Sequence, residues 1–277
     1  MDRIGYPKGV TADINSDEIF VCDSRKQRLL IFDTSGFFKF QIRGGDRFEV
    51  PLDIAIDPEG FLFLLASRLG TWEILKLDFD GKPLGTIAIG GDFERLKEAR
   101  IVSLAISPLG DYLYALDAEN LLLWILRTSG EIERAVDLAS HLDEEARDDE
   151  VLRNVDVYDD TVIVPLAMTG EILTFDLDGN STGRVGVKGM ATCKLAFPTA
   201  AGILPSGRLL VLDQQKMVVT VWDSESNQCL GEYGGLGSKP GDLYFPNNLS
   251  IHPDGQVYIS QGYEGRVQVF SGFGDPE

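Results

Sequence analysis

The segment Tyr6-Pro-Lys-Gly-Val-Thr-Ala-Asp13 decides the fold, because similar segments recur along the chain. Two clear copies are Val50-Pro-Leu-Asp-Ile-Ala-Ile-Asp57 and Phe245-Pro-Asn-Asn-Leu-Ser-Ile-His252, and a degenerate copy begins at Leu152. The repeated units start near residues 6, 50, 100, 152, 197 and 245. A period of this length indicates a solenoid, a propeller or an array of repeats.

Each unit contains the same succession of turns and apolar runs. In the second unit the turn Asp57-Pro-Glu-Gly60 leads into the run Phe61–Ala66, and the alternating run Glu73–Leu77 ends at the hairpin turn Asp78-Phe-Asp-Gly81. Four short antiparallel strands in each of six units predict an all-β, six-bladed β-propeller that fills residues 1–277 as a single domain. The stretch 138–152, rich in Glu, Asp, Ala and Leu, predicts a short helical insertion at the surface.

The first and last units resemble the NHL repeat family. The resemblance is carried by Pro7, Asp23 and Arg28 with their neighbours, and again by the stretch from Pro246 to Phe270. It covers nearly the whole chain and implies a six-bladed propeller of NHL type. WD repeats are the rival assignment, but Trp222-Asp223 is the only Trp-Asp pair and no Gly-His pair precedes it.

The ends of the chain leave two points open. The last unit stops soon after Phe270, so either Asp2–Gly5 supplies its outer strand and closes the ring, or the sixth sheet has three strands. The first repeat begins within six residues of Met1, with no apolar signal segment before it. We therefore expect a cytoplasmic protein or, since similar propellers often belong to exported proteins, an excised extracytoplasmic or envelope domain.

Composition restricts the possible partners. The chain has 25 basic and 44 acidic residues, a formal charge of −19, while 44% hydrophobic content is enough for a globular core. A strongly acidic chain makes nucleic acid an unlikely partner, although Ser24-Arg-Lys-Gln-Arg28 is locally basic. Apolar runs such as Leu121–Leu126 are far shorter than a bilayer-spanning helix requires, so membrane insertion is not expected.

The three cysteines, Cys22, Cys193 and Cys229, form no CxxC pair. An odd number at these spacings fits neither a disulfide scaffold nor a zinc ribbon. We expect three unpaired buried thiols, with a bridge between Cys193 and Cys229 as the alternative.

The residues that known propeller enzymes need are mostly missing. His141 and His252 are too few for the zinc site of an NHL-like lyase. The lactonase-like propellers hold calcium at the channel, and here only Asp53, Asn247 and Asn248 could contribute oxygen atoms at the strand starts. No serine has a nucleophile motif or a credible histidine partner, so we predict no catalytic residue and, at most, a weak calcium site.

The loops on one face are the remaining candidate for function. Loops between the second and third strands, and between successive units, should emerge together, with a basic side near Ser24–Arg28 and an acidic side at Asp143–Glu150. The sequence therefore predicts a non-catalytic scaffold that binds a protein or peptide; the alternative is a metal-dependent lactonase or lyase. The predicted loop-face contacts are Arg25, Lys26, Arg28, Arg68, Trp72, Met168 and Tyr263.

Overall fold

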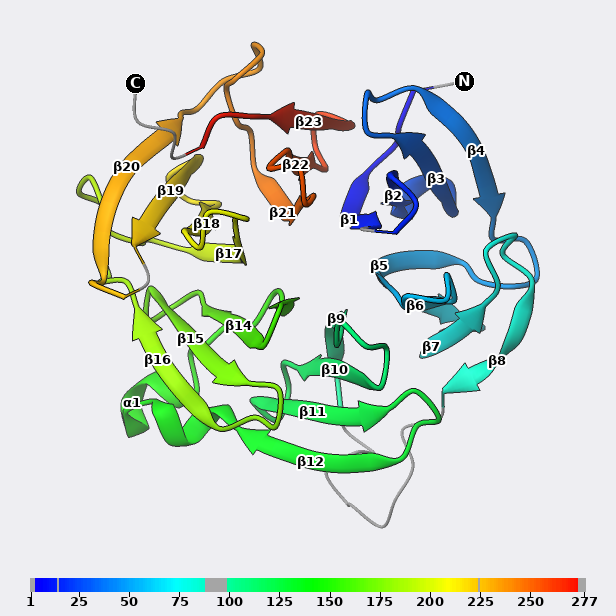
Figure 1. The fold of residues 1–277 in the computed structure, drawn as a ribbon, viewed down its shortest axis with the longest axis horizontal. Helices are drawn as coiled ribbons and strands as arrows, with labels where there is room; N and C mark the ends of the chain where they lie inside the picture. The colour runs from blue at the N-terminus through cyan, green and yellow to red at the C-terminus, as the bar shows by residue number, and fades with distance from the viewer. Residues whose placement is uncertain (1–2, 14, 88–98, 224, 274–277) are drawn as a thin grey trace.

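The computed structural model of the chain describes residues 3–13, 15–87, 99–223 and 225–273. Within these residues the chain forms six antiparallel sheets, or blades, arranged in a ring around a central axis (Figure 1). The prediction of a six-bladed, all-β propeller is therefore confirmed.

The blades follow one another along the chain, and each runs from an inner strand at the axis to an outer strand at the rim (Figure 1). The strands of the first three blades are β1 (Pro7–Asp13), β2 (Glu18–Asp23), β3 (Arg28–Asp33), β4 (Phe38–Arg43); β5 (Val50–Ile56), β6 (Leu62–Arg68), β7 (Thr71–Leu77), β8 (Pro83–Ile87); and β9 (Ile101–Ile106), β10 (Tyr112–Asp117), β11 (Leu122–Arg127), β12 (Ile132–Asp137). Those of the last three are β13 (Asp156–Tyr158), β14 (Thr161–Leu166), β15 (Glu171–Asp176), β16 (Ser181–Val185); β17 (Pro198–Ile203), β18 (Leu209–Asp213), β19 (Val218–Asp223), β20 (Gln228–Gly234); and β21 (Pro246–Ile251), β22 (Val257–Gln261), β23 (Arg266–Phe270).

The inner strands carry an irregularity just after the repeated proline. In β5 the pairing with β6 shifts between Pro51 and Asp53, and equivalent shifts follow Pro7, Pro198 and Pro246. Proline cannot donate a hydrogen bond to the ladder, so a bulge at this point is expected. The bulge lies where the inner strand enters the central channel.

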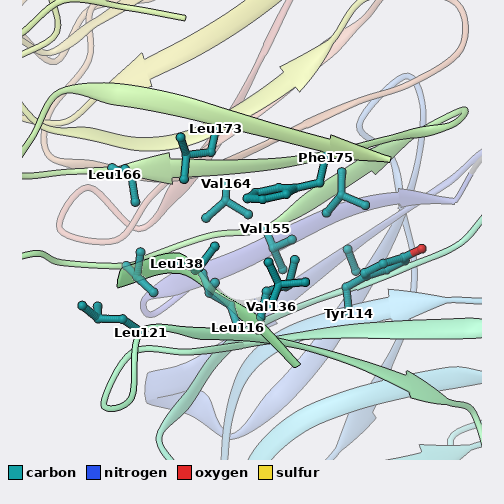
Figure 2. Packing of buried hydrophobic residues seen from close by; sticks show 14 of the residues in the cluster. Tyr114, Leu116, Leu121, Val136, Leu138, Val155, Val164, Leu166, Leu173 and Phe175 are labelled. Atoms are coloured by element: carbon teal, nitrogen blue, oxygen red, sulfur yellow. The ribbon is translucent and has the colours of Figure 1, made fainter. Parts of the chain in front are cut away.

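Apolar side chains pack between neighbouring blades rather than in one central core. Residues of the second and third strands on facing sheets make up most of each cluster, because alternate residues of a strand point to opposite faces of its sheet. Figure 2 shows the cluster between blades three and four, where Tyr114 and Leu116 face Val164 and Phe175. These contacts fix the radial arrangement of the sheets.

The ring closes through contacts between the first and last blades. The sixth sheet has three strands in the described residues, and residues 3–5 of the alternative closing segment Asp2–Gly5 form no strand, while Asp2 lies outside the described residues. Val10, Ile19 and Val21 of the first blade pack with Tyr258 of β22, and the Ala12 backbone N–H donates to Ser250 Oγ at 2.9 Å. The seam is therefore held by packing and side-chain hydrogen bonds.

The insertion between blades three and four is less helical than predicted. The stretch 138–152 contains a 3₁₀ turn, Leu138–His141, and one α-helical turn, α1 (Glu144–Arg147), instead of a continuous helix. Leu142 between them is extended, with φ −112° and ψ 146°, and its buried side chain joins the cluster below. Packing of this leucine interrupts the helix. No helix in the described part of the chain is long and apolar enough to cross a membrane.

The expectation of three unpaired thiols is wrong for two of them. Cys193 forms a disulfide with Cys229 of β20, with the Cα atoms 5.6 Å apart, and Cys22 is a buried free thiol. Cys193 lies in the connection between the fourth and fifth blades, which folds back against the outer strand of the fifth. That approach depends on the ring geometry, which the spacing of the cysteines in the sequence does not reveal.

Candidate functional site

The six inner strands enclose a cavity of about 400 Å³ on the ring axis. Its walls combine apolar and polar residues, and it extends to the turns that follow the inner strands, where Asn15, Pro58 and Pro253 line it. We call this side of the ring the turn face. The opposite side, where the loops between second and third strands and between blades lie, is the loop face. A cavity of this size is typical of a small-molecule site.

A polar network crosses the deep end of the cavity. Asp53 Oδ2 accepts hydrogen bonds from Ser103 Oγ at 2.6 Å and from the Leu104 backbone N–H at 2.9 Å. Asn154 Nδ2 donates to Ser103 Oγ at 3.3 Å and to Asn248 Oδ1 at 3.4 Å. The network thus joins blades two, three, four and six. The buried Asn154 Oδ1 has no hydrogen-bond partner among the described residues.

Asp156 is a second carboxyl group in the channel, and sequence reasoning missed it. It lies on β13, two strand positions beyond Asn154, and its Oδ1 accepts a hydrogen bond from the Val157 N–H at 2.9 Å. The residue as a whole is half-buried, and its carboxyl group is surrounded by protein atoms. Aligning the repeats could have identified it, because Asp156 occupies the same position of its inner strand as Thr11 does in the first unit.

Burial raises the pKa of both channel carboxyl groups. The pKa of Asp53 rises to about 6 because burial outweighs its hydrogen bonds from Ser103, Leu104 and Ile54 and the nearby charge of Lys8. The pKa of Asp156 rises to about 7, mainly through burial, and the charge of Asp53 adds to the effect. Both carboxyl groups therefore titrate near neutral pH.

Two cations lie at the loop-face end of the channel. Burial lowers the pKa of Lys8, and the charge of Arg153 lowers it further, while Asp53 acts in the opposite direction. Lys8 belongs to the first blade and Arg153 precedes the inner strand of the fourth. Blades one and four lie on opposite sides of the ring (Figure 1). The Arg153 guanidinium also lies 5.9 Å from the centre of the Phe197 ring.

The residues predicted for calcium do not form a cation cage. Asp53 and Asn248 line the cavity, but the side chain of Asn247 donates to the Pro7 carbonyl oxygen at 3.1 Å. Asp53 and Asn248 oxygens already accept hydrogen bonds, whereas calcium requires six to eight oxygen ligands. The described residues contain no group of three or more acidic, histidine or cysteine side chains suited to a metal. These residues do not fit the calcium site, and we derive no metal chemistry from them.

The predicted basic loop-face residues have different environments. Arg25 and Lys26 are exposed in the 3₁₀ turn η1 (Ser24–Lys26), where Lys26 Nζ donates to the Arg3 carbonyl oxygen. Arg28 is buried instead, with its Nε 3.0 Å from Asp23 Oδ2. Arg68 is half-buried and lies 3.4 Å from Glu73. Arg25 and Lys26 are therefore the exposed basic residues of this set.

The predicted apolar contacts are all exposed, but they lie on different blades. Trp72 belongs to blade two, Met168 to blade four and Tyr263 to blade six, with exposed fractions of 50%, 41% and 69%. The Met168 backbone N–H donates to the Glu150 carboxylate at 2.8 Å, so that acidic residue holds a loop of blade four. Tyr263 alone is part of a larger group of exposed rings.

Four rings gather on the loop face where the last blade meets the first. Tyr263 lies 5.8 Å from Tyr6 and 5.5 Å from Phe245, and Tyr244 lies 5.0 Å from Phe245, measured between ring centres and with edge-to-face geometry. We call Tyr6, Tyr244, Phe245 and Tyr263 the aromatic patch. Tyr6 and Phe245 each directly precede the repeated proline, so aligning the first and last units in a closed ring could have predicted the patch.

Phe245 holds a backbone conformation that a bulky residue rarely adopts. Its φ is 41°, in the left-handed region, and the residue is 40% exposed. Such a conformation costs of order 1–3 kcal/mol and persists only where the surroundings impose it. The Phe245 N–H donates to the Met217 sulfur at 3.1 Å, a contact from the neighbouring blade. The patch is therefore held in a defined arrangement.

The comparisons with known proteins identify the fold alone. No family model and no curated protein matches the chain. Among solved structures, a protein of unknown function from Bacteroides thetaiotaomicron VPI-5482 is similar with a TM-score of 0.72 and 12% identity, over 97% of this chain and 70% of that one. Kuenenia stuttgartiensis hydrazine synthase is similar with a TM-score of 0.65 and 13% identity, over 99% of this chain and 97% of that chain. The propeller fold is supported, and the NHL assignment stays a prediction.

Proposed function

We propose that this propeller is a non-catalytic binding module that holds a protein or peptide on its loop face. The aromatic patch carries the proposal. Clustered, partly exposed tyrosine and phenylalanine rings are enriched at protein interfaces, because they bury much surface for little loss of side-chain freedom. The fixed position of Phe245 lowers the ordering cost of binding further.

The surroundings of the patch favour a partner with acidic groups. The Ser24 backbone N–H donates to the Tyr6 carbonyl oxygen at 3.0 Å, so the basic turn η1 lies directly beside the patch. Arg25 and Lys26 are exposed there, within a chain whose net charge is −19. A local positive region on an acidic surface would orient a partner that carries both an apolar anchor and carboxylates.

The test uses a phage-displayed library of random linear peptides selected on the immobilised protein. Peptides selected on the native chain should bind about 30-fold more weakly to a Tyr263→Ala variant, the loss expected for a hot-spot residue worth about 2 kcal/mol. Phe37→Ala is the matched control. Phe37 is 72% exposed and lies in the β3–β4 turn, on the opposite face.

Selected peptides should also contain more Asp and Glu than the starting library, and Arg25→Ala with Lys26→Ala should weaken them. Equal binding to the native chain, Tyr263→Ala and Phe37→Ala would refute the proposal. Failure of the library to yield any binding peptide would count against it as well.

A further inference from the structure

The charged residues that line the central cavity are all acidic, although Lys8 and Arg153 lie beyond its deep end, and the loop-face proposal does not use them. Four aspartates, Asp13, Asp53, Asp156 and Asp159, are among its lining residues, and no Lys, Arg or His of the described chain lines it. When these carboxyl groups are ionised, they produce a negative potential in the cavity. The cavity therefore suits a cationic ligand.

The deep end contains a buried acceptor atom that no described residue satisfies. Asn154, which is 6% exposed, has an Oδ1 atom with no hydrogen-bond partner among the described residues. Asp156 Oδ2 faces Gly202 of the next blade, where an added Cβ would lie 2.9 Å away, so the glycine leaves space for this oxygen. Buried acceptors are normally satisfied, and an ammonium group would supply the missing donors.

Asp156 forms no ion pair with a Lys, Arg or His among the described residues. Lys8 lies close enough to Asp53 to lower the pKa of that carboxyl group. The pKa of Asp156 is instead shifted by burial, by the hydrogen bond from the Val157 N–H and by the charge of Asp53. A ligand ammonium beside Asp156 would relieve the repulsion between the two carboxylates.

A second region of carboxylates lies at the turn face. Asp13 stands two strand positions beyond the level of Asp156, roughly 7 Å along the channel, and Asp159 lies in the turn that follows β13. Ile56, Ile106 and Ile251, each one strand position beyond the level of Asp156, are among the apolar lining residues between the two regions. Negative charge at both ends of a short apolar passage matches a ligand with ammonium groups at both ends of a methylene chain.

We propose that the cavity binds a linear aliphatic diamine or polyamine, with one ammonium group at Asp156 and Asn154 and another near Asp13 and Asp159 at the turn face. A divalent metal suits this site less well, because the Asp53 and Asn248 oxygens are already hydrogen-bonded and few ligand positions remain. The apolar part of the lining instead matches methylene groups.

The test is isothermal titration calorimetry of the native chain with spermidine, and with n-butylamine and 1,4-butanediol as probes that carry one charge and none. Spermidine should bind saturably at one site, n-butylamine at least tenfold more weakly, and the diol without measurable heat. The proposal is overturned if spermidine gives no saturable heat, or if calcium binds at this site and spermidine does not.

Asp156→Asn should weaken spermidine binding at least tenfold, because it removes the charge and keeps the acceptor for the Val157 N–H. Asp80→Asn is the control for the diffuse attraction of an acidic protein, since Asp80 is exposed in the β7–β8 turn. Equal losses in the two variants would overturn the proposal. Native-like circular dichroism of Asp156→Asn establishes that it folds, and Tyr263→Ala, on the other face, should leave spermidine binding unchanged.

Discussion

Replacing Arg28 by Ala tests whether this residue supports the fold or forms part of the surface. Its side chain is 7% exposed, and Asp23 opposite it is fully buried. The Asp23 carboxylate also accepts from the Gly5 N–H at 3.0 Å and the Tyr6 N–H at 2.9 Å, and Arg28 reaches the Arg3 carbonyl oxygen at 3.2 Å. The pair therefore attaches the segment before β1 to the first blade.

Removing one partner of a buried ion pair leaves the other charge without compensation, which costs about 3–5 kcal/mol. At about 2–4 °C per kcal/mol for chains of 150–250 residues, the melting temperature of Arg28→Ala should fall by roughly 10 °C. Urea denaturation followed by tryptophan fluorescence measures the free energy of unfolding, and scanning calorimetry measures the melting temperature.

Arg25→Ala is the matched control, because Arg25 is exposed three residues away and its loss should change stability by less than about 0.5 kcal/mol. A second variant, Arg28→Met with Asp23→Asn, removes both charges and should be more stable than Arg28→Ala. Equal stability of Arg28→Ala and Arg25→Ala would refute the argument that Arg28 is a structural residue.

Two further predictions concern the bridge and the channel. Replacing Cys193 and Cys229 by Ser should lower the free energy of unfolding by about 3–4 kcal/mol, because the bridge closes a loop across a sequence separation of 36 residues; an unchanged urea midpoint in the variant would contradict this. The pKa of Asp156 is raised to about 7 in the folded chain, so the folded chain binds the proton of this carboxyl group more tightly than the unfolded chain does. The free energy of unfolding therefore falls as the pH rises from about 4 to 7 and Asp156 ionises. Asp156→Asn should therefore gain stability relative to the native chain over that range, and urea midpoints with parallel pH dependence would contradict the raised pKa.

The repeated segment around Pro7 was sufficient to predict six blades, because a propeller repeats one local pattern of turns and alternating strands. The extent of the helical insertion was harder to predict. Its Glu, Asp, Ala and Leu content favours a helix, but Leu142 turns into the core between blades and divides the stretch. Tertiary packing overrides local propensity at this point.

The candidate sites depend on contacts between units, which the sequence shows poorly. Asp53 could be identified because it follows a repeated proline, whereas Asp156 belongs to the degenerate fourth copy and its neighbour Gly202 comes from the next blade. Arg28 belongs to a locally basic run that resembles a surface patch, and its burial follows from Asp23, five residues earlier. Charge alone does not distinguish an exposed arginine from a buried, paired one.

The seam between the last and first blades affects the order of folding. Its hydrogen bonds, such as Ala12 to Ser250 and Ser260 to Lys8, join residues separated by 238 and 252 positions. Contacts of such long range carry the largest loop-closure entropy, so the individual hairpins can form early and the seam forms late. During synthesis from the N-terminus, the apolar face of the first blade at Val10, Ile19 and Val21 stays uncovered until β22 has been made.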